Sequence, residues 1–441
     1  MTGLLLSYYG DDLTGSTDVM EALTLRGVPT VLFIRRPESH QRARFPAVRA
    51  IGLAGTSRSE TPAWMDEHLP EAFDWLAGLD APVCHYKVCS TFDSSPGIGS
   101  IGRALDLGRA RFGGVVPVVV GAPQLRRYTL FGQLFAAYQG QVHRIDRHPV
   151  MSRHPVTPMT EADLVRHLSQ QTAARIGHVD QLALASADAD EQVDAAAAGC
   201  DALLLDVGDL TGQAAAGRQL LRLQAAGSRF IVGSSGVEYA LAAAWMAQNL
   251  IAPPAAFPLP GSCDRIAVVS GSVSPTTARQ IRHAEQHGFA RITVAPSAFF
   301  RPGGEAAIGA ALREAQEALA AGRSVILHTA LGPDTDLGAG LDGFEGARHA
   351  IGRGLGRLLA SVVRTAGLKR AVIAGGDTSS HALGEMGIFA LTTCLPLPRT
   401  PGSPLCTAHS DDSVFDGLQI ALKGGQVGDD DYFLRIRDGV A

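Results

Sequence analysis

The chain has 441 residues, more than a single compact core usually holds, so its length predicts two domains. Hydrophobic residues make up 46% and charged residues 18%, a balance that supplies ample apolar material for globular cores. The formal net charge is −5, and lysine and arginine occur in no run longer than a pair, which argues against a nucleic-acid partner.

The six cysteines form no CxxC pair and no spacing typical of a zinc finger. We therefore expect reduced thiols and a cytoplasmic protein. The apolar start, residues 1–6, is too short for a secretory signal. No apolar run approaches the ~20 residues that a membrane span needs, so a membrane partner is not expected.

Short, partly β-branched apolar runs alternate with amphipathic stretches in the first half of the chain. The runs predict buried strands over residues 4–9, 28–34, 48–54, 83–88, 115–120, 182–185, 203–207 and 230–232. The stretches between them predict helices over residues 16–25, 61–79 and 161–172. Pro70 should break or kink the second helix, and Thr160 with Asp163 resembles a capping box for the third.

Residues 252–262 contain four prolines in eleven positions, which suits a semi-rigid linker. We place a first domain at 1–252, the linker at 253–262 and a second domain at 263–441. After the linker, strands are predicted over 266–269, 291–294, 325–329 and 371–374, and helices over 276–287, 305–320 and 347–365. The fold class is therefore α/β, with two domains that each hold a mostly parallel sheet flanked by helices, and a ligand cleft between them.

Two adjacent aspartates follow the first predicted strand, at the end where open α/β sheets place their ligands. Asp11 and Asp12 repel each other unless a cation, a ligand or hydrogen-bond donors stabilise them. One interpretation is that an aspartate only caps the following helix. The other is that one of the pair is a general base. We expect that base to be Asp12, because alternation along an extended strand end turns only one neighbour toward a substrate.

A lysine and an arginine lie at the ends of other predicted strands. Lys87 falls in an apolar run, so we expect it to point into the cleft toward an anion; the alternative is an edge strand from which it reaches solvent. Arg58 has the geometry to bind a carboxylate as a fork, and a surface arginine without a role is the alternative. Asp93, six residues after Lys87, is a further candidate for binding the substrate.

Three glycine-rich turns lie in the second half, at residues 270–277, 374–381 and 422–428. The first two join a strand to a helix. Each turn alone is better explained as structural, but three in one domain indicate backbone N–H groups around phosphates. The chain contains no GxxxxGK[ST], so a Walker A loop is not predicted. It also has no GxGxxG after its first predicted strand, which argues against dinucleotide binding.

Two His-Pro pairs, at His148 and His154, lie six residues apart. A metal site is one interpretation, and an extended interdomain or rim segment is the one we favour. His328 follows an apolar run and is predicted to be a hydrogen-bonded core histidine.

Seven segments, taken in order, resemble the four-carbon acid sugar kinase family over almost the whole chain. They are DDLTGSTD (11–18), GTSRS (55–59), YKVCSTFDSSPGIGSIG (86–102), HPVTPMTEADL (154–164), SGSVSPTT (270–277), GGDTSS (375–380) and ALKGGQVGDDDYF (421–433). The family commonly has GGET where this chain has GGDT, which keeps a carboxylate. The resemblance implies a two-domain ATP-dependent kinase, with the sugar acid bound by the first domain and the nucleotide by the second.

The motifs and the resemblance together give the candidate site residues. The candidates in the substrate domain are Asp11 and Asp12 for catalysis and Arg58, Lys87 and Asp93 for substrate binding. The candidates for nucleotide binding are Ser272, Ser274, Gly375, Gly376, Asp377, Thr378 and Gly425.

The predicted function is ATP-dependent phosphorylation of a hydroxyl of a small sugar acid, with ATP and Mg²⁺ as cofactors. The substrate is a four-carbon acid such as threonate, erythronate or 3-oxo-tetronate, or a related branched or 3-oxo sugar acid. Two other functions are left open: a non-catalytic two-lobe sugar-acid sensor, which would consume no ATP, and a nucleotide-dependent oxidoreductase, which would change NADH fluorescence. A homo-oligomer is compatible with the sequence.

Overall fold

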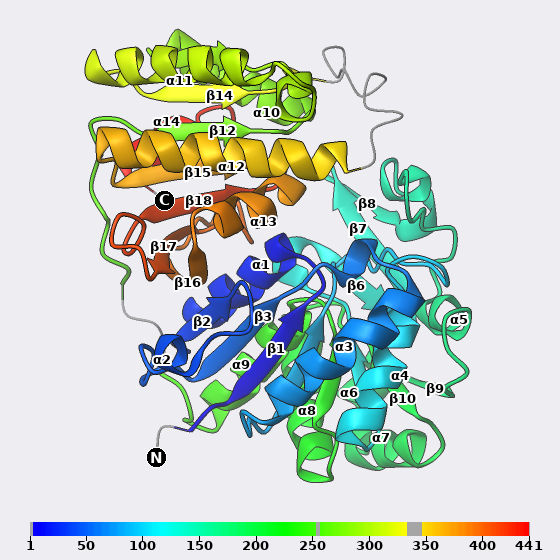
Figure 1. Cartoon of the computed structure of the whole chain (residues 1–441). Coiled ribbons are helices and arrows are strands. Elements are labelled where there is room, and N and C mark those ends of the chain that lie inside the picture. Colours follow the sequence, from blue (N-terminus) through cyan, green and yellow to red (C-terminus); the bar gives the residue numbers. More distant parts are fainter. Residues whose placement is uncertain (1–2, 253–255, 333–345, 441) are drawn as a thin grey trace. The chain divides into compact units, whose positions relative to one another are not determined.

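The structure is a computed structural model that describes residues 3–252, 256–332 and 346–440 (Figure 1). It divides into two compact units, Met1–Val31 with Glu38–Ala255 and Leu32–Pro37 with Ala256–Ala441. We did not predict that Leu32–Pro37 belong to the second unit while the residues on both sides belong to the first. The apolar residues of this segment give no indication of which sheet they join. Residues 253–255 of the predicted linker lie outside the described residues.

Unit 1 is built on a parallel sheet with the strand order β3-β1-β4-β11-β5-β10-β9. The apolar runs of the sequence account for six of these strands, and their side chains are almost all buried. The strands are β1 (Leu6–Gly10), β3 (Ala50–Ala54), β4 (Cys84–Lys87), β5 (Val116–Val119), β9 (Ile176–Val179), β10 (Ala202–Leu205) and β11 (Phe230–Gly233).

The helices of unit 1 form two groups: α3 packs against α4, while α9 packs against both α1 and α8. The longer helices are α1 (Leu13–Thr24), α3 (Pro62–Ala77), α4 (Ile101–Phe112), α7 (Ala189–Ala198), α8 (Leu210–Ala225) and α9 (Gly236–Ala247). The shorter ones are α2 (Ser39–Arg42), α5 (Leu164–Ser169) and α6 (Gln181–Ala185).

Two local predictions for unit 1 were wrong, and of the break or kink predicted at Pro70 the structure contradicts the break. Residues 182–185 form part of helix α6 and not a strand, because a four-residue apolar run has no period of its own and Asp180 caps a helix there. Helix α3 runs unbroken through Pro70, supported by burial of its apolar face. Helix α5 begins after Asp163, whose side chain accepts from the Arg166 N–H, so Thr160 is not its cap.

A small antiparallel sheet follows β5 in unit 1 and was not predicted. It consists of β6 (Arg127–Leu130), β7 (Gln133–Tyr138) and β8 (Gln141–Arg144). Two 3₁₀ turns, Ile145–Arg147 and Met151–Arg153, then lead to the segment that contains His154 and Thr157. The predicted extended stretch around the His-Pro pairs is therefore partly turned.

Unit 2 has the strand order β13-β14-β12-β15-β18-β17-β16, in which the first five strands are parallel. β17 runs antiparallel to both of its neighbours, and β16 also pairs with Leu32 and Phe33 of β2. The strands are β2 (Thr30–Phe33), which the unit boundary divides, β12 (Ala267–Ser270), β13 (Ala290–Thr293), β14 (Val325–His328), β15 (Arg370–Ala374), β16 (Ile388–Leu395), β17 (Leu405–Ser410) and β18 (Gln419–Lys423).

The helices of unit 2 pack in two sets, α11 on α12 on α13, and α10 on α14. They are α10 (Pro275–Gln286), α11 (Glu305–Ala320), α12 (Ala347–Ala366), α13 (Gly376–Glu385) and α14 (Tyr432–Asp438). His328, at the end of β14, is buried and bonded at both ring nitrogens, to the Ala330 carbonyl (3.0 Å) and the Thr293 hydroxyl (3.2 Å). The prediction of a hydrogen-bonded core histidine is confirmed.

Candidate active site

The sheet of unit 1 brings three predicted segments together. β3, β1 and β4 are parallel neighbours, so their carboxyl ends meet at one edge of the sheet. Asp11 and Asp12 follow β1, Arg58 lies in the 3₁₀ turn after β3, and Lys87 is the last residue of β4. Backbone bonds hold the segments in register, since the Asp11 N–H donates to the Lys87 carbonyl (2.9 Å) and the Arg58 N–H to the Asp11 carbonyl (3.1 Å).

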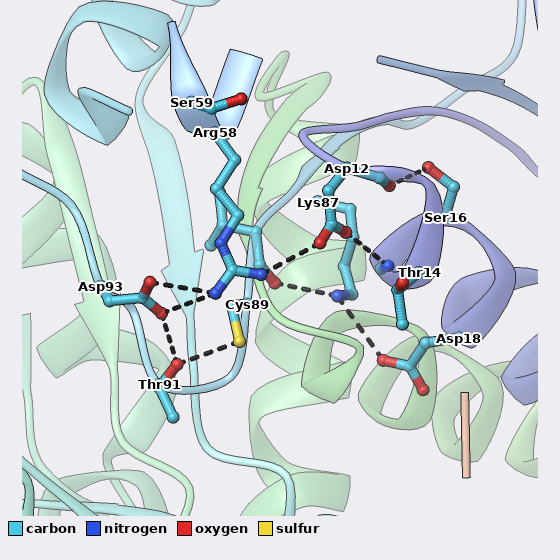
Figure 2. Close-up of polar contacts among 12 residues, drawn as sticks. Asp12, Thr14, Ser16, Asp18, Arg58, Ser59, Lys87, Cys89, Thr91 and Asp93 are labelled. Atoms are coloured by element: carbon cyan, nitrogen blue, oxygen red, sulfur yellow. Dashed lines mark hydrogen bonds and ion pairs between the residues drawn. The ribbon is translucent and has the colours of Figure 1, made fainter. Parts of the chain in front are cut away.

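The Arg58 guanidinium bridges two carboxylates (Figure 2). Its Nη1 donates to Asp12 Oδ2 at 3.0 Å, and its Nη2 donates to Asp93 Oδ1 and Oδ2 at 3.1 and 3.0 Å. The side chain is 29% exposed. Arg58 is therefore not a surface arginine without contacts. Both terminal nitrogens of its guanidinium donate to carboxylates of the protein.

Asp12 does cap the first helix. Its Oδ1 accepts from the Gly15 N–H at 2.5 Å, which makes it the N-cap of α1, while its Oδ2 faces Arg58. Both oxygens thus have partners, and the side chain is 31% exposed. A Cβ on Gly15 would come within 2.7 Å of Asp12 Oδ1, so this close turn requires glycine.

Asp93 is buried, with its side chain fully enclosed. Burial alone would raise the pKa of the carboxyl, but the charge of Arg58 and hydrogen bonds from Thr91 and Arg58 outweigh it and hold the pKa below its usual range. Thr91 Oγ1 donates at 2.5 Å, and Thr157 Oγ1 donates from the distant segment after the small sheet at 3.2 Å. Asp93 is therefore a firmly held anion whose main visible role is to fix Arg58.

Lys87 is 2% exposed, and β4 has a neighbour on each side, so the edge-strand interpretation is wrong. Its Nζ lies 3.5 Å from Asp18 Oδ2 and donates to the Val88 carbonyl at 2.9 Å. Burial alone would lower the pKa of the ammonium, but the carboxylates of Asp18 and Asp11 raise it above its usual value. Lys87 is therefore a buried cation.

Asp11 is the unusual member of the pair. It is 5% exposed, and its Oδ1 has no hydrogen-bond partner among the described residues. Burial and the neighbouring Asp12 charge raise the pKa of Asp11 to about 7, against the opposing influence of Arg58 and Lys87. A carboxyl that both exchanges a proton near neutral pH and has a free oxygen is suited to acid–base chemistry.

Sequence reasoning missed three contributors to this cluster: Asp18, Thr91 and Thr157. Asp12 caps helix α1, and Asp18 lies on that helix one turn after Thr14. This helical spacing within the first motif was the available signal for Asp18. Thr91 lies two residues from Asp93, but Thr157 is 64 residues away and no local pattern pairs them.

The predicted nucleotide residues also lie together, in unit 2. Ser274 caps α10, and its N–H donates to Ser272 Oγ at 3.3 Å. A Cβ on Gly425 would stand 3.0 Å from Ser272 Oγ, so the third glycine turn packs against the first. Gly375, which has φ +124°, lies before α13 with its Cβ position 3.0 Å from Thr378 Oγ1 and 3.6 Å from the Ser272 N atom. Gly376 and Asp377 open α13.

The two His-Pro histidines have local partners. His148 Nδ1 accepts from the N–H groups of Val150 and Met151, and His154 Nδ1 from that of Thr157. In the part of the chain that the structure describes, no three histidine, cysteine or acidic side chains are grouped as metal ligands. Nor is any helix in residues 3–252, 256–332 or 346–440 long and apolar enough to cross a membrane.

Comparison with known proteins identifies both units. Residues 6–241 match the family model described as a sugar-binding N-terminal domain, and residues 267–433 match the one described as a nucleotide-binding C-terminal domain. The chain belongs to the four-carbon acid sugar kinase family. The resemblance that the seven segments indicated is thereby confirmed.

The relatives match over their full lengths. A 3-oxo-isoapionate kinase of Paraburkholderia graminis is 49% identical, with 99% of this chain and 95% of that protein covered. 3-oxo-tetronate kinases of Methylobacterium radiotolerans and Burkholderia multivorans are 30% and 31% identical, over 99% of this chain and 100% and 98% of theirs. A solved structure described as a putative tRNA synthase from Salmonella typhimurium has the same fold, with a TM-score of 0.77, 24% identity and 99% of both chains covered.

The Arg58 bridge yields a first prediction. In Arg58→Lys the positive charge is kept, but an ammonium cannot donate to Asp12 and Asp93 in one planar fork. Loss of a charged hydrogen bond is typically worth ~1.5–3 kcal/mol, so the KM for the sugar acid should rise about tenfold or more while the KM for ATP changes little. Steady-state kinetics with each substrate varied in turn measures both.

Arg103→Lys is the matched control, because Arg103 pairs with Asp66 at the exposed surface of the same unit. It should leave both constants unchanged. An unaltered KM for the acid in the Arg58 variant would show that the bridge does not contribute to substrate recognition.

Proposed function

We propose that the chain is an ATP-dependent kinase that phosphorylates a hydroxyl of a small sugar acid, and that its substrate is a branched 3-oxo acid of the 3-oxo-isoapionate type. The observation that carries the activity is the Asp11–Asp12–Arg58–Lys87 cluster within the residues matched to a sugar-binding domain. The 49% identity with a 3-oxo-isoapionate kinase, against 30% and 31% with two 3-oxo-tetronate kinases, favours the branched acid.

In this proposal the two cations hold the acid. Lys87 Nζ lies near the Gly15 turn, since a Cβ there would be 3.1 Å from Nζ and 3.7 Å from Asp11 Oδ1. The ammonium and the free oxygen of Asp11 therefore lie close to the same turn, and we place the substrate beside this turn. Arg58, fixed by its two carboxylates, adds positive charge at a defined position.

We assign the general base to Asp11, in place of the Asp12 that strand alternation favoured. Both oxygens of Asp12 are engaged, by the α1 N-terminus and by Arg58, and protonating it would weaken both contacts. Asp11 has an unbonded oxygen, and its pKa of about 7 lies where a base is most effective. Asp11 takes the proton from the attacking hydroxyl as the oxygen bonds to the γ-phosphorus and the bond from that phosphorus to the bridging oxygen of ADP breaks.

The nucleotide is assigned to the loops of unit 2 around Ser272, Gly375 to Thr378 and Gly425. Mg²⁺ would enter with ATP, since this ion usually retains waters and substrate phosphates and takes only one or two protein carboxylates. When bound, the ion supplies charge neutralisation at the phosphates.

The substrate prediction is tested by ATP-dependent phosphorylation across a panel of acids, read by mass spectrometry. The panel contains branched 3-oxo acids, linear 3-oxo-tetronates, and threonate and erythronate without the oxo group. We expect the highest kcat/KM with the branched 3-oxo acid. A preference for a linear acid would contradict the substrate assignment alone, whereas ATP-independent binding with no phosphorylated product would contradict the kinase assignment.

The aspartate assignment makes a separate prediction. Asp11→Asn keeps the shape but cannot accept the proton, so kcat should fall by ~10²–10⁴-fold while acid binding persists. Asp12→Asn loses the ion pair with Arg58 but keeps an oxygen that can cap α1, so it should mainly raise the KM for the acid. If Asp12→Asn instead carries the large loss in kcat, Asp12 is the base.

The pH dependence should follow the same residue. A base must be deprotonated, so kcat/KM for the wild-type chain should rise as the pH increases through about 7 and then level off. The residual rate of Asp11→Asn should lack this step. The profile is measured under saturating ATP and Mg²⁺, and a step that persists in the variant would assign the titration to another group.

A further inference from the structure

The chain has three lysines, and two of them are buried at the carboxyl end of a parallel strand. Lys423 ends β18, between β15 and β17, and is 1% exposed. Whereas Lys87 has Asp18 as its partner, no described carboxylate forms an ion pair with Lys423. A buried ammonium without a counter-ion is costly, so this position calls for an explanation.

Lys423 Nζ is surrounded by neutral oxygens. It donates to the carbonyl of Gly424 at 2.8 Å, to that of Gly425 at 3.4 Å and to Thr277 Oγ1 on helix α10 at 3.0 Å. The Thr277 hydroxyl in turn donates to the Gly425 carbonyl at 3.0 Å. Three acceptors match the three protons of an ammonium group. Burial with no opposing charge lowers the pKa of Lys423 to about 7.

These contacts determine where the peptide N–H groups of the turn point. In a planar trans peptide the N–H points opposite to the C=O of the same unit. The two carbonyls face Nζ, so the N–H groups of Gly425 and Gln426 face away from it. Neither N–H donates to a described residue. Two consecutive N–H groups that no described residue accepts are therefore available to an anion on the side of the turn away from Nζ.

The turn also lies among the predicted nucleotide residues. The Cβ position of Gly425 is 3.0 Å from Ser272 Oγ and 3.3 Å from Ser274 Cβ, at the N-terminus of α10. This helix has 12 residues, and the positive end of its dipole adds to the charge of Lys423. An anion that accepts from these N–H groups would therefore lie in the electrostatic field of the Lys423 ammonium and of the α10 N-terminus.

We propose that Lys423 is a positioning residue for the nucleotide: it holds the Gly424 and Gly425 carbonyls inward, so that the N–H groups of Gly425 and Gln426 bind a phosphate group. This inference rests on the proposed nucleotide binding in unit 2 and adds a residue to it. The bound phosphate also supplies the negative charge that the buried ammonium otherwise lacks.

The test compares ligands that differ only in phosphate. Isothermal titration measures adenosine, ADP and a non-hydrolysable ATP analogue against the full chain and its Lys423→Met variant. Charged hydrogen bonds are worth ~1.5–3 kcal/mol, so the Kd for ADP and the analogue should rise about 10- to 100-fold. The Kd values for adenosine and the sugar acid should not change, and Lys423→Arg should recover part of the ADP affinity.

Lys369→Met is the matched control, since Lys369 is exposed just before β15, the strand that pairs with β18. It should bind all ligands as the wild type does.

Equal loss of adenosine and ADP affinity in Lys423→Met would mean a purely structural role and overturn the proposal, as would unchanged ADP affinity. If Lys423→Met does not fold, Thr277→Val should show a smaller loss confined to the phosphorylated ligands, and its absence overturns the proposal. A wild-type chain that binds the acid but no nucleotide would instead overturn the proposed function, and this inference with it.

Discussion

The site of unit 1 depends on the bridge from Arg58 to Asp12 and Asp93. Each of the three residues follows a different strand, and none of their loops belongs to a regular ladder that would hold it in place. The guanidinium joins them through three hydrogen bonds of 3.0–3.1 Å. Because Asp12 also begins α1 and Asp93 also binds Thr157, the bridge ties a helix, a 3₁₀ turn and a distant segment to one planar group.

The charges of this cluster do not balance. Four carboxylates, of Asp11, Asp12, Asp18 and Asp93, surround the two cations Arg58 and Lys87. Asp12, Asp18 and Asp93 each have a cation within 3.5 Å, so the excess falls on Asp11, which is also the most deeply buried of the β1 pair. Burial is the main cause of the raised pKa of Asp11, and the neighbouring Asp12 charge adds to it, so this carboxyl is prepared to take a proton from a hydroxyl.

The two buried lysines show two ways of keeping a cation inside an α/β unit. Lys87 is compensated by a carboxylate of its own unit, and its pKa is raised. Among the residues that the structure describes, Lys423 binds hydroxyl and carbonyl oxygens and no carboxylate, and its pKa is lowered. A lysine whose charge is balanced by a carboxylate of the protein can attract an anionic group of a ligand, and its own charge is stable without that ligand. An uncompensated lysine gains most from the arrival of a phosphate, which is why we connect Lys423 with the nucleotide.

The sequence by itself determined the α/β class, most of the strands and the position of each motif at a strand end, because apolar runs and glycine-rich turns are local patterns. It also brought Asp11, Asp12, Arg58, Lys87 and Asp93 forward as one candidate set. Only the tertiary structure decided how these side chains pair, since strand order and burial depend on residues far apart in the chain. Asp12 became the helix cap and Asp11 the free carboxyl, Thr157 reached Asp93 across 64 residues, and Lys423 was buried with no ion pair to a described carboxylate. A pKa follows from desolvation and neighbouring charge, and neither exists until the chain has folded.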